Sequence, residues 1–257
     1  MRNNEKLWLI GGTGDSVRIA RAIAEKFLSY IVTVTTSQAI HLYANDPKVN
    51  LRIGKLNIED IHNFCIQEKV KGIIDASHPF AENISRHVIN IAQHHSIPYI
   101  RYERPRLPID SQIIYLDSFK TLITKKYLID KNVLFTVGCK VLPMFRPYHE
   151  RSFLFTRILP RLDSLKIALS AGFREENIIS LRPPISLDLE KAIWRQWKID
   201  IVITKASGKQ GGEDIKSKVS KDLGIPLIVI QRPNINYPRC TQQIPDIINF
   251  CYECLKQ

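Results

Sequence analysis

The sequence predicts an α/β fold built from two similar halves. Residues 73–105 read as a buried strand, a loop, an amphipathic helix, a second strand and an Arg-Pro stop. Residues 203–233 repeat this order, and the two stretches match at Ser77 and Ser207 and at both Arg-Pro pairs. Strand–helix–strand units of this kind are what α/β sheets are made of, so each half is expected to contain one sheet.

Length and composition place the chain among globular proteins. Its 257 residues are enough for two domains, and 44% are hydrophobic and 24% charged. No apolar run approaches the roughly 20 residues of a membrane helix. The first residues enter a strand without the long apolar stretch of a signal peptide. Five unevenly spaced cysteines favour a reducing cytoplasm without disulfides, so we expect a cytoplasmic protein with no membrane partner.

The net charge of +12 is the most informative number in the composition. A positive excess of this size argues for an anionic partner, which can be a nucleic acid, a membrane surface or a small polyanion.

A glycine turn follows the first predicted strand. Residues 7–10 form a short apolar run, and residues 11–16 read Gly-Gly-Thr-Gly-Asp-Ser before a helix whose apolar face begins at Ala20. The N–H groups and dipole of such a helix start favour a phosphate or a carboxylate. Val17 stands where GxGxxG has its third glycine, so a tight turn without a ligand is the alternative.

The next strand, residues 30–36, is rich in β-branched residues and carries no acid at its end. A dinucleotide fold selective for NAD usually has an acid there to hold the ribose diol. Hydroxyl groups at Thr36 and Ser37 beside a basic surface therefore favour NADP if a nicotinamide cofactor binds. The remaining elements expected in this half are an edge strand at 51–54, a helix at 58–68 and a strand at 70–75.

Asp75-Ala-Ser-His-Pro-Phe80 lies at the carboxyl end of that last strand, where open α/β sheets place ligands. His78 precedes a proline, so its backbone is biased toward an extended conformation, and its imidazole can exchange a proton near neutral pH. A histidine that only satisfies loop hydrogen bonds is the alternative. The clustering of Asp75, Ser77 and His78 makes these three the catalytic candidates.

The second half begins after a strand at 112–116 and a helix at 118–129, which we expect to form the crossover between domains. Further strands are expected at 133–137, 153–157, 178–179 and 201–204, with a helix around 189–197 and another from about Pro245 to the end. Residues 205–212 read Lys-Ala-Ser-Gly-Lys-Gln-Gly-Gly and make a second candidate anion site, with a flexible loop of solvated lysines as the alternative.

Two motifs near the end of the chain are set aside. Cys251 and Cys254 form a CxxC without a second pair, and Tyr252 and Lys256 have the spacing of short-chain reductases without a strand before them. We interpret all four as ordinary positions of an amphipathic helix and expect no metal site.

The chain resembles the precorrin-6A reductase family of corrin biosynthesis, whose anaerobic branch contains cobalt-precorrin-6A reductase. The resemblance covers nearly the whole chain and rests on these motifs: Leu9-Ile-Gly-Gly-Thr13, Asp75-Ala-Ser-His-Pro-Phe-Ala81, Arg101-Tyr-Glu-Arg-Pro105, Thr136-Val-Gly138, Thr204-Lys-Ala-Ser-Gly208, Gly224-Ile-Pro226 and Arg232-Pro233. Gly14-Asp15 and Lys205-Ala206 depart from the family pattern, and the second departure puts a carboxylate role at that place in doubt.

The resemblance implies two Rossmann-like domains with mainly parallel sheets and a cleft between them. We expect a cofactor-binding domain at 1–130 and a substrate-binding domain at 131–257. The implied activity is the reduction of a macrocycle double bond in precorrin-6A or cobalt-precorrin-6A by NADPH, with NADH as the alternative. The substrate is a tetrapyrrole bearing acetate and propionate groups, which is a small polyanion and accounts for the net charge.

The expected sites follow from this assignment. Cofactor-binding residues are Gly11, Gly12, Thr13, Gly14, Asp15, Ser16, Thr36 and Ser37. Substrate-binding residues, most of them cations near strand ends, are Arg101, Arg104, Lys140, Arg157, Lys205, Ser207 and Gly208.

Two other functions remain open from the residues alone. A basic nucleic-acid-binding protein on a Rossmann-like scaffold would explain the charge, although the aromatic residues do not alternate with basic ones. A non-catalytic NAD(P)-binding protein would need only the first glycine turn. We expect the enzyme, acting as a monomer or small homo-oligomer without nucleic acid.

Overall fold

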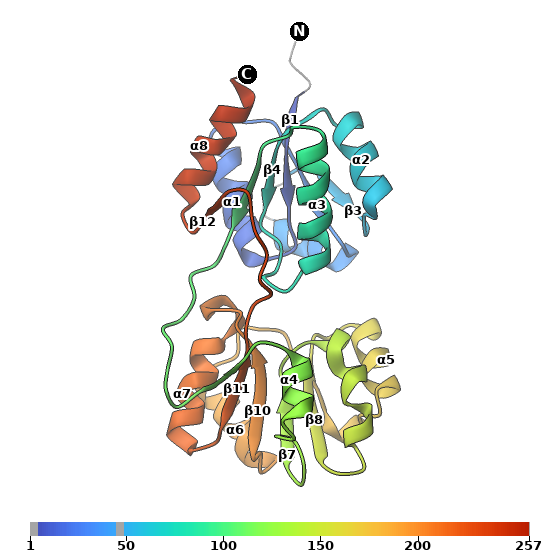
Figure 1. The fold of residues 1–257 in the computed structure, drawn as a ribbon, viewed down its shortest axis with the longest axis vertical. Helices are drawn as coiled ribbons and strands as arrows, with labels where there is room; N and C mark the ends of the chain where they lie inside the picture. The colour runs from blue at the N-terminus through green and yellow to red at the C-terminus, as the bar shows by residue number, and fades with distance from the viewer. Residues whose placement is uncertain (1–4, 45–48, 257) are drawn as a thin grey trace. The chain divides into compact units, whose positions relative to one another are not determined.

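The computed structural model describes residues 5–44 and 49–256, and the chain divides into two compact units (Figure 1). The first unit runs to Pro105 and resumes at Pro233, and the second unit is Arg106–Arg232. Each unit contains a six-stranded sheet among its described residues. No helix in the described ranges has the length and apolar character needed to cross a membrane.

The first sheet has the strand order β12-β5-β4-β1-β2-β3, and every pairing in it is parallel. This order is that of a doubly wound dinucleotide-binding sheet. The elements of the first unit are β1 (Lys6–Ile10), α1 (Gly14–Ala24), β2 (Tyr30–Val34), the 3₁₀ helix η1 (Ser37–Tyr43), β3 (Leu51–Ile53), α2 (Ile58–Gln67), β4 (Val70–Asp75), α3 (Glu82–His94), β5 (Tyr99–Tyr102), β12 (Cys240–Thr241) and α8 (Ile244–Leu255).

Both faces of the first sheet are covered, which explains why β1 is a continuous apolar run rather than an alternating one. Leu7 and Leu9 pack in a buried cluster with residues of α1 and α8. Trp8 and Ile10 point to the other face and pack with residues of α2 and α3. Figure 1 shows α8 beside α1, although the two helices lie at opposite ends of the sequence.

The second sheet has the order β6-β11-β10-β7-β8-β9 and is also parallel throughout its described pairings. The elements of the second unit are β6 (Ile114–Leu116), α4 (Phe119–Thr124), β7 (Asn132–Phe135), η2 (Cys139–Tyr148), β8 (Phe153–Ile158), α5 (Leu162–Ser170), η3 (Glu175–Asn177), β9 (Ile178–Ser180), α6 (Leu187–Gln196), β10 (Ile201–Lys205), η4 (Lys209–Gly211), α7 (Glu213–Leu223) and β11 (Leu227–Ile230). The predicted α/β class with mainly parallel sheets is therefore confirmed.

The core of the second unit is likewise two-sided. Leu134 and Val202 pack with Trp194 of α6 and Val219 of α7. On β7, the next residue, Phe135, contacts Phe145 of η2 with ring centroids 4.4 Å apart. Successive strand residues thus point to opposite covered faces.

The domain boundary expected at residue 130 is wrong. Strand β6 pairs with β11, so residues 106–130 belong to the second unit. Strand β12 pairs with β5, and α8 packs on the first sheet, so the end of the chain belongs to the first unit. These edge strands have three and two residues. Strands so short carry no periodicity that could reveal their sheet, and only the pairing register decides it.

The internal repeat is confirmed by the topology. The β4-α3-β5 and β10-α7-β11 segments occupy the same places in their two sheets. Their shared Arg-Pro pairs mark the two points at which the chain passes from one unit to the other, after Pro105 and before Pro233. A proline cannot donate to a sheet and biases the residue before it to an extended conformation, so it ends the strand region and directs the chain outward.

Candidate functional site

The strand order places a ligand site at the carboxyl ends of β1 and β4 in the first unit. These two strands are neighbours at the centre of the sheet, and the chain leaves them in opposite directions, to β2 and to β5. Open α/β sheets bind ligands at such a switch point. The glycine turn follows β1, and the loop of Asp75, Ser77 and His78 follows β4, so the structure brings the cofactor and catalytic candidates of this unit to one sheet edge.

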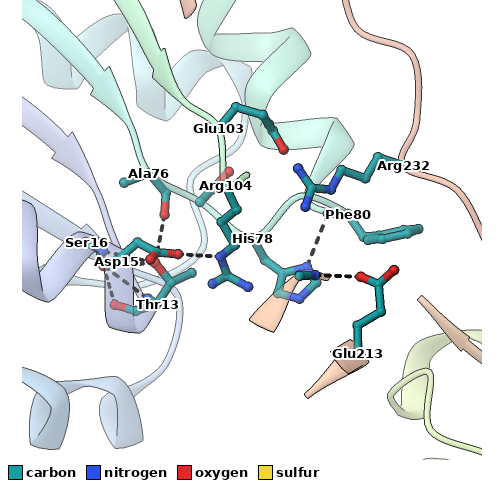
Figure 2. A network of polar contacts seen from close by, with 12 residues as sticks. Thr13, Asp15, Ser16, Ala76, His78, Phe80, Glu103, Arg104, Glu213 and Arg232 are labelled. Carbon is teal, nitrogen blue, oxygen red and sulfur yellow. Dashed lines mark hydrogen bonds and ion pairs between the residues drawn. The ribbon is translucent and has the colours of Figure 1, made fainter. Parts of the chain in front are cut away.

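The glycine turn is held by its own hydrogen bonds (Figure 2). Thr13 caps α1 in a capping box: the Ser16 N–H donates to Thr13 Oγ1, and the Thr13 N–H donates to Ser16 Oγ, both at 3.1 Å. The Thr13 hydroxyl donates to the Ala76 carbonyl at 2.9 Å, which ties the turn to the loop after β4. The Gly11 N–H donates to the Thr33 carbonyl at 2.9 Å.

Two backbone donors at the start of α1 stay open. Among the described residues, none accepts a hydrogen bond from the N–H groups of Gly14 and Asp15. Gly14 is exposed, and a Cβ added to it would meet nothing within 4 Å. The turn therefore carries two unpaired backbone donors at the positive end of a helix dipole, beside the exposed Gly14, which is the arrangement that binds a phosphate.

Asp15 lies beside these donors, and its charge is compensated. The side chain is 3% exposed, and the Arg104 Nε–H donates to its Oδ2 (Figure 2). Arg104 follows β5, so its side chain reaches past the end of β4 to the turn after β1. Without this partner a buried carboxylate here would repel an anion at the helix start.

Asp75 forms the centre of a buried network. This network joins the motif that begins at Asp75 to the motif that begins at Arg101. Asp75 and Arg101 are register partners on β4 and β5. The Arg101 Nη1 donates to Asp75 Oδ1 at 2.8 Å and to Ser77 Oγ at 3.0 Å. Ser85 and Tyr99 donate their hydroxyl protons to Asp75 Oδ2 at 2.6 and 2.7 Å. Asp75 and Arg101 are 0% and 1% exposed.

The network keeps Asp75 ionised. Burial by itself would raise the pKa of Asp75, but the Arg101 guanidinium and the hydrogen bonds from Ser85, Ser77 and Tyr99 hold that pKa below its usual value. On its other edge, Arg101 donates from Nε to Glu103 Oε2 at 3.1 Å. Asp75 is thus a permanent anion paired inside the unit and has no proton to give.

His78 differs from the other two catalytic candidates because its side chain is exposed. Its Nδ1 accepts the Phe80 N–H at 3.2 Å, and its carbonyl accepts the Ala81 N–H at 2.8 Å. A neutral imidazole that accepts at Nδ1 carries its proton on Nε2, so the hydrogen bond from Phe80 selects that tautomer of His78. Of the three, His78 is the side chain placed to exchange a proton with a ligand.

In the second unit, Lys205 is the last residue of β10 and Lys140 lies in η2 after β7, and these are the two strands at the equivalent switch point. Lys205 is half-buried, and its Nζ lies 5.6 Å from the centre of the Phe119 ring. Burial and the positive charge of Lys140 lower the pKa of Lys205 to about 8, against a small opposing effect of Cys139. The Lys140 charge thus disfavours the charged form of Lys205, and a bound anion would relieve that repulsion.

The loop of residues 205–212 is ordered by an internal carboxylate rather than left open. Glu213 is 5% exposed, and its Oε2 accepts the Gly208 N–H at 2.7 Å. Lys216, 2% exposed, donates from Nζ to the Gly211 and Gly212 carbonyls at 3.0 and 2.8 Å. The Ser207 hydroxyl donates to the Lys205 carbonyl at 3.2 Å. This segment is therefore held by hydrogen bonds within its own unit.

The remaining candidates fall in different surroundings. Arg157 is paired with the buried Glu190 through an Nη1···Oε2 contact of 2.5 Å, and Glu190 also accepts the Trp194 indole N–H at 3.0 Å. Thr36 and Ser37 begin η1 at the carboxyl end of β2, half-buried and exposed respectively.

In the part of the chain that the structure describes, no group of three or more His, Cys, Asp or Glu side chains could hold a metal ion.

Sequence reasoning missed several residues of these networks. Tyr43, Ser85, Tyr99 and Glu213 each hold a site loop by a side-chain hydrogen bond. Tyr99 and Ser85 lie 24 and 10 residues from Asp75. Of these four, only Glu213 could have been predicted from the sequence, since an acid at a helix start after a glycine-rich loop is a typical partner for loop N–H groups.

Comparisons with known proteins show the family and the fold of the chain. Residues 6–252 match the family model of precorrin-6x reductase CbiJ/CobK. The chain is 42% identical to the cobalt-precorrin-6A reductase of Synechocystis sp. over 248 residues, covering 95% of each chain. It is 34% identical to that of Priestia megaterium, covering 94% of this chain and 96% of the relative. The solved structure of the precorrin-6A reductase CobK has the same fold, with a TM-score of 0.80, 18% identity and coverage of 97% and 96%.

Proposed function

This chain belongs to the precorrin-6x reductase family, and we propose that it reduces a double bond of the cobalt-precorrin-6A macrocycle with a hydride from NADPH. Family membership makes it an oxidoreductase of cobalamin biosynthesis that acts on a CH–CH group of the macrocycle. The cobalt-containing form of the substrate is supported by the two relatives above, both named for it. Metal-free precorrin-6A and NADH are the alternatives.

The observation that carries the proposal is the turn after β1. Its open Gly14 and Asp15 N–H groups and the unfilled space at Gly14 fit the diphosphate of a nicotinamide cofactor. Asp15 Oδ1 is buried and accepts no hydrogen bond from the described residues, which fits a site completed by a ligand's donors. The hydroxyls of Thr36 and Ser37, in place of an acid, favour NADPH over NADH.

The residues of the first unit then have distinct tasks. A bound reduced nicotinamide supplies the hydride. His78, as the imidazolium that forms when Nδ1 takes up a proton and releases the Phe80 N–H, gives its Nε2 proton to the macrocycle and returns to a neutral imidazole. Asp75 and Arg101 are buried, pair with each other and hold the Ser77–His78 loop, so we reassign both from ligand contact to positioning. Arg104 keeps Asp15 neutralised at the helix start.

Lys140 and Lys205 are the residues we propose for the substrate carboxylates. Their mutual repulsion in a partly buried place supports this role. We assign Arg157 and the loop residues Ser207 and Gly208 instead to holding the second unit's loops, because Glu190 pairs with Arg157 and Glu213 accepts the Gly208 N–H. The remaining proposals are a cytoplasmic monomer or small homo-oligomer that binds no nucleic acid specifically.

The reaction is tested by anaerobic incubation of the protein with cobalt-precorrin-6A and NADPH. One cofactor should be oxidised for each macrocycle reduced, and the macrocycle spectrum should change in step with the loss of NADPH absorbance. Parallel reactions with NADH and with metal-free precorrin-6A rank the alternatives. If no combination oxidises a cofactor, the proposal fails.

Replacing Gly14 by valine should raise the dissociation constant of NADPH by at least about tenfold, or roughly 1.4 kcal/mol. A Cβ at this position would meet no atom within 4 Å, and Gly14 lies outside the left-handed region, so the backbone tolerates a side chain here. Gly12 is the less useful target because its φ of +92° strains any side chain. Fluorescence titration measures the effect, and unchanged affinity in the folded variant would move the cofactor elsewhere.

The affinity for the macrocycle should fall as pH rises through about 8, because Lys205 loses its charge near that pH. Lys140→Ala removes the neighbouring positive charge and should shift this fall to higher pH. Lys205→Ala should weaken substrate binding by about 1.5–3 kcal/mol if the contact is shielded from water, and should leave NADPH affinity unchanged. A pH profile of substrate binding that is the same in all three proteins would refute the assignment.

A further inference from the structure

Tyr43 lies outside the glycine turn in sequence but is bonded to two of its groups. It is the last residue of η1, and its side chain is 3% exposed. Its hydroxyl oxygen accepts the Gly12 N–H at 3.2 Å and lies 2.6 Å from Ser16 Oγ. Burial raises the pKa of Tyr43 despite these hydrogen bonds, so the hydroxyl keeps its proton at neutral pH.

The direction of the bond to Ser16 follows from counting hydroxyl protons. The Thr13 hydroxyl donates its proton to the Ala76 carbonyl at 2.9 Å. The Ser16 hydroxyl donates its own to the Thr13 carbonyl at 2.7 Å. Each hydroxyl has one proton, so the proton between Tyr43 and Ser16 comes from Tyr43. Tyr43 therefore both donates to and accepts from the turn and fixes it at two points.

The Tyr43 side chain also explains why residue 11 is a glycine, although the backbone conformation at this position does not require one. Gly11 lies outside the left-handed region, so its conformation is open to any residue. A Cβ at Gly11, however, would lie 2.4 Å from the Tyr43 hydroxyl oxygen and 2.7 Å from Val32 Cγ1. The turn and the tyrosine are packed as one unit, with no room for a side chain between them.

Helix η1 also begins where the other end of the cofactor is expected. Its N-cap is Thr36 and its first residue is Ser37, at the carboxyl end of β2. This strand end is where dinucleotide folds recognise the adenosine ribose. One short helix thus joins the expected ribose contact to the expected diphosphate contact, and Tyr43 is its attachment to the turn.

We propose that Tyr43 is a positioning residue for the nicotinamide cofactor, which keeps the diphosphate turn and the ribose-binding segment in one binding-competent arrangement. This inference rests on the cofactor site proposed above. A protein that is competent only for a fraction of the time binds with an apparent dissociation constant raised by the inverse of that fraction. Loss of the hydroxyl should therefore weaken cofactor binding and leave the reaction of the bound cofactor unchanged.

The test is Tyr43→Phe, which removes the hydroxyl and keeps the ring in place. The dissociation constants of NADPH and of 2′,5′-ADP should both rise about tenfold, corresponding to a competent fraction of roughly one tenth. The kcat at saturating NADPH and the KM of the macrocycle should stay at the wild-type values. Tyr148→Phe is the matched control, because it removes a hydroxyl that donates to the Ile123 carbonyl at 3.1 Å in the second unit. Its cofactor affinity should not change.

The outcomes separate this inference from the cofactor site itself. Unchanged or tighter NADPH binding by Tyr43→Phe would overturn the positioning role, as would a lower kcat at saturation with unchanged affinity. If Tyr43→Phe does not fold, Ser16→Ala removes the other end of the same bond, and the same rise in the dissociation constant is expected from it. Failure of the wild-type protein to bind either ligand would instead reject the proposed cofactor site.

Discussion

Replacing Asp75 by asparagine is expected to lower the free energy of unfolding of the first unit by about 3–5 kcal/mol. The variant keeps the size of the side chain and removes its charge, which leaves the Arg101 guanidinium buried beside a neutral partner. Ser85 and Tyr99 also lose an anionic acceptor. Hydrogen exchange of the β4 and β5 amides measures the effect within this unit, which matters because a two-unit chain need not unfold in one step.

The pH dependence of the same variant checks the cause. The folded-state pKa of Asp75 is lowered, so its contribution to stability is present above the unfolded value of about 3.9 and is lost as pH falls through the folded-state pKa. The difference between wild type and Asp75→Asn should therefore shrink in acid. Glu82→Ala is the control, since its ion pair with Arg86 is about half exposed, and such surface pairs contribute roughly 0.3–0.5 kcal/mol. Equal losses from both variants would contradict the network.

Replacing His78 by alanine is expected to lower kcat by about 10²- to 10⁴-fold, the usual contribution of a general acid. NADPH affinity should change little, because the turn after β1 makes its hydrogen bonds without His78. Single-turnover reduction of the macrocycle under anaerobic conditions measures the effect. His94→Ala is the matched control, since His94 is an exposed histidine at the far end of α3 and should leave kcat unchanged.

A second substitution separates proton donation from loop positioning. Asparagine at position 78 can still accept the Phe80 N–H with its side-chain oxygen, as asparagine does in turns, but it cannot serve as an acid. His78→Asn should therefore be as slow as His78→Ala. Full activity of His78→Asn together with a slow His78→Ala would make His78 a loop residue. Full activity of both would remove it from the mechanism.

Much of the first unit's site was predictable because its parts are local in sequence. The apolar run of β1, the glycine turn and the start of α1 are contiguous, and a buried strand that enters a helix through glycines has few other structures available. The loop after β4 was predictable for the same reason. What each residue does there was not: Asp75 and His78 are three residues apart, yet one is a buried, paired anion and the other an exposed imidazole. Burial of a side chain depends on what packs over it, and that comes from β5 and α3.

The cationic candidates show more clearly that the sequence does not reveal what surrounds a side chain. Arg101, Arg157 and Lys205 were chosen alike, as positive charges near strand ends. The structure pairs Arg101 with Asp75 and Arg157 with Glu190, and holds Lys205 beside a second cation. The partners lie 26 and 33 residues away from the two arginines. No spacing rule connects residues that far apart, so the sequence alone could not tell which cations form ion pairs within the fold.

By itself the sequence determined the α/β class, the repeat, the family and the loops that form the candidate site, because periodicity, glycine turns and short motifs act over a few neighbouring residues. The tertiary structure alone decided which strands complete each sheet, which charges are paired and that Tyr43 belongs to the glycine turn. Those outcomes depend on contacts between distant segments: β12 joins β5 across more than half the chain, and a two-residue strand has no pattern of its own. The physical reason is that hydrogen-bond register and burial are properties of pairs of elements, and a pair exists only once the chain has folded.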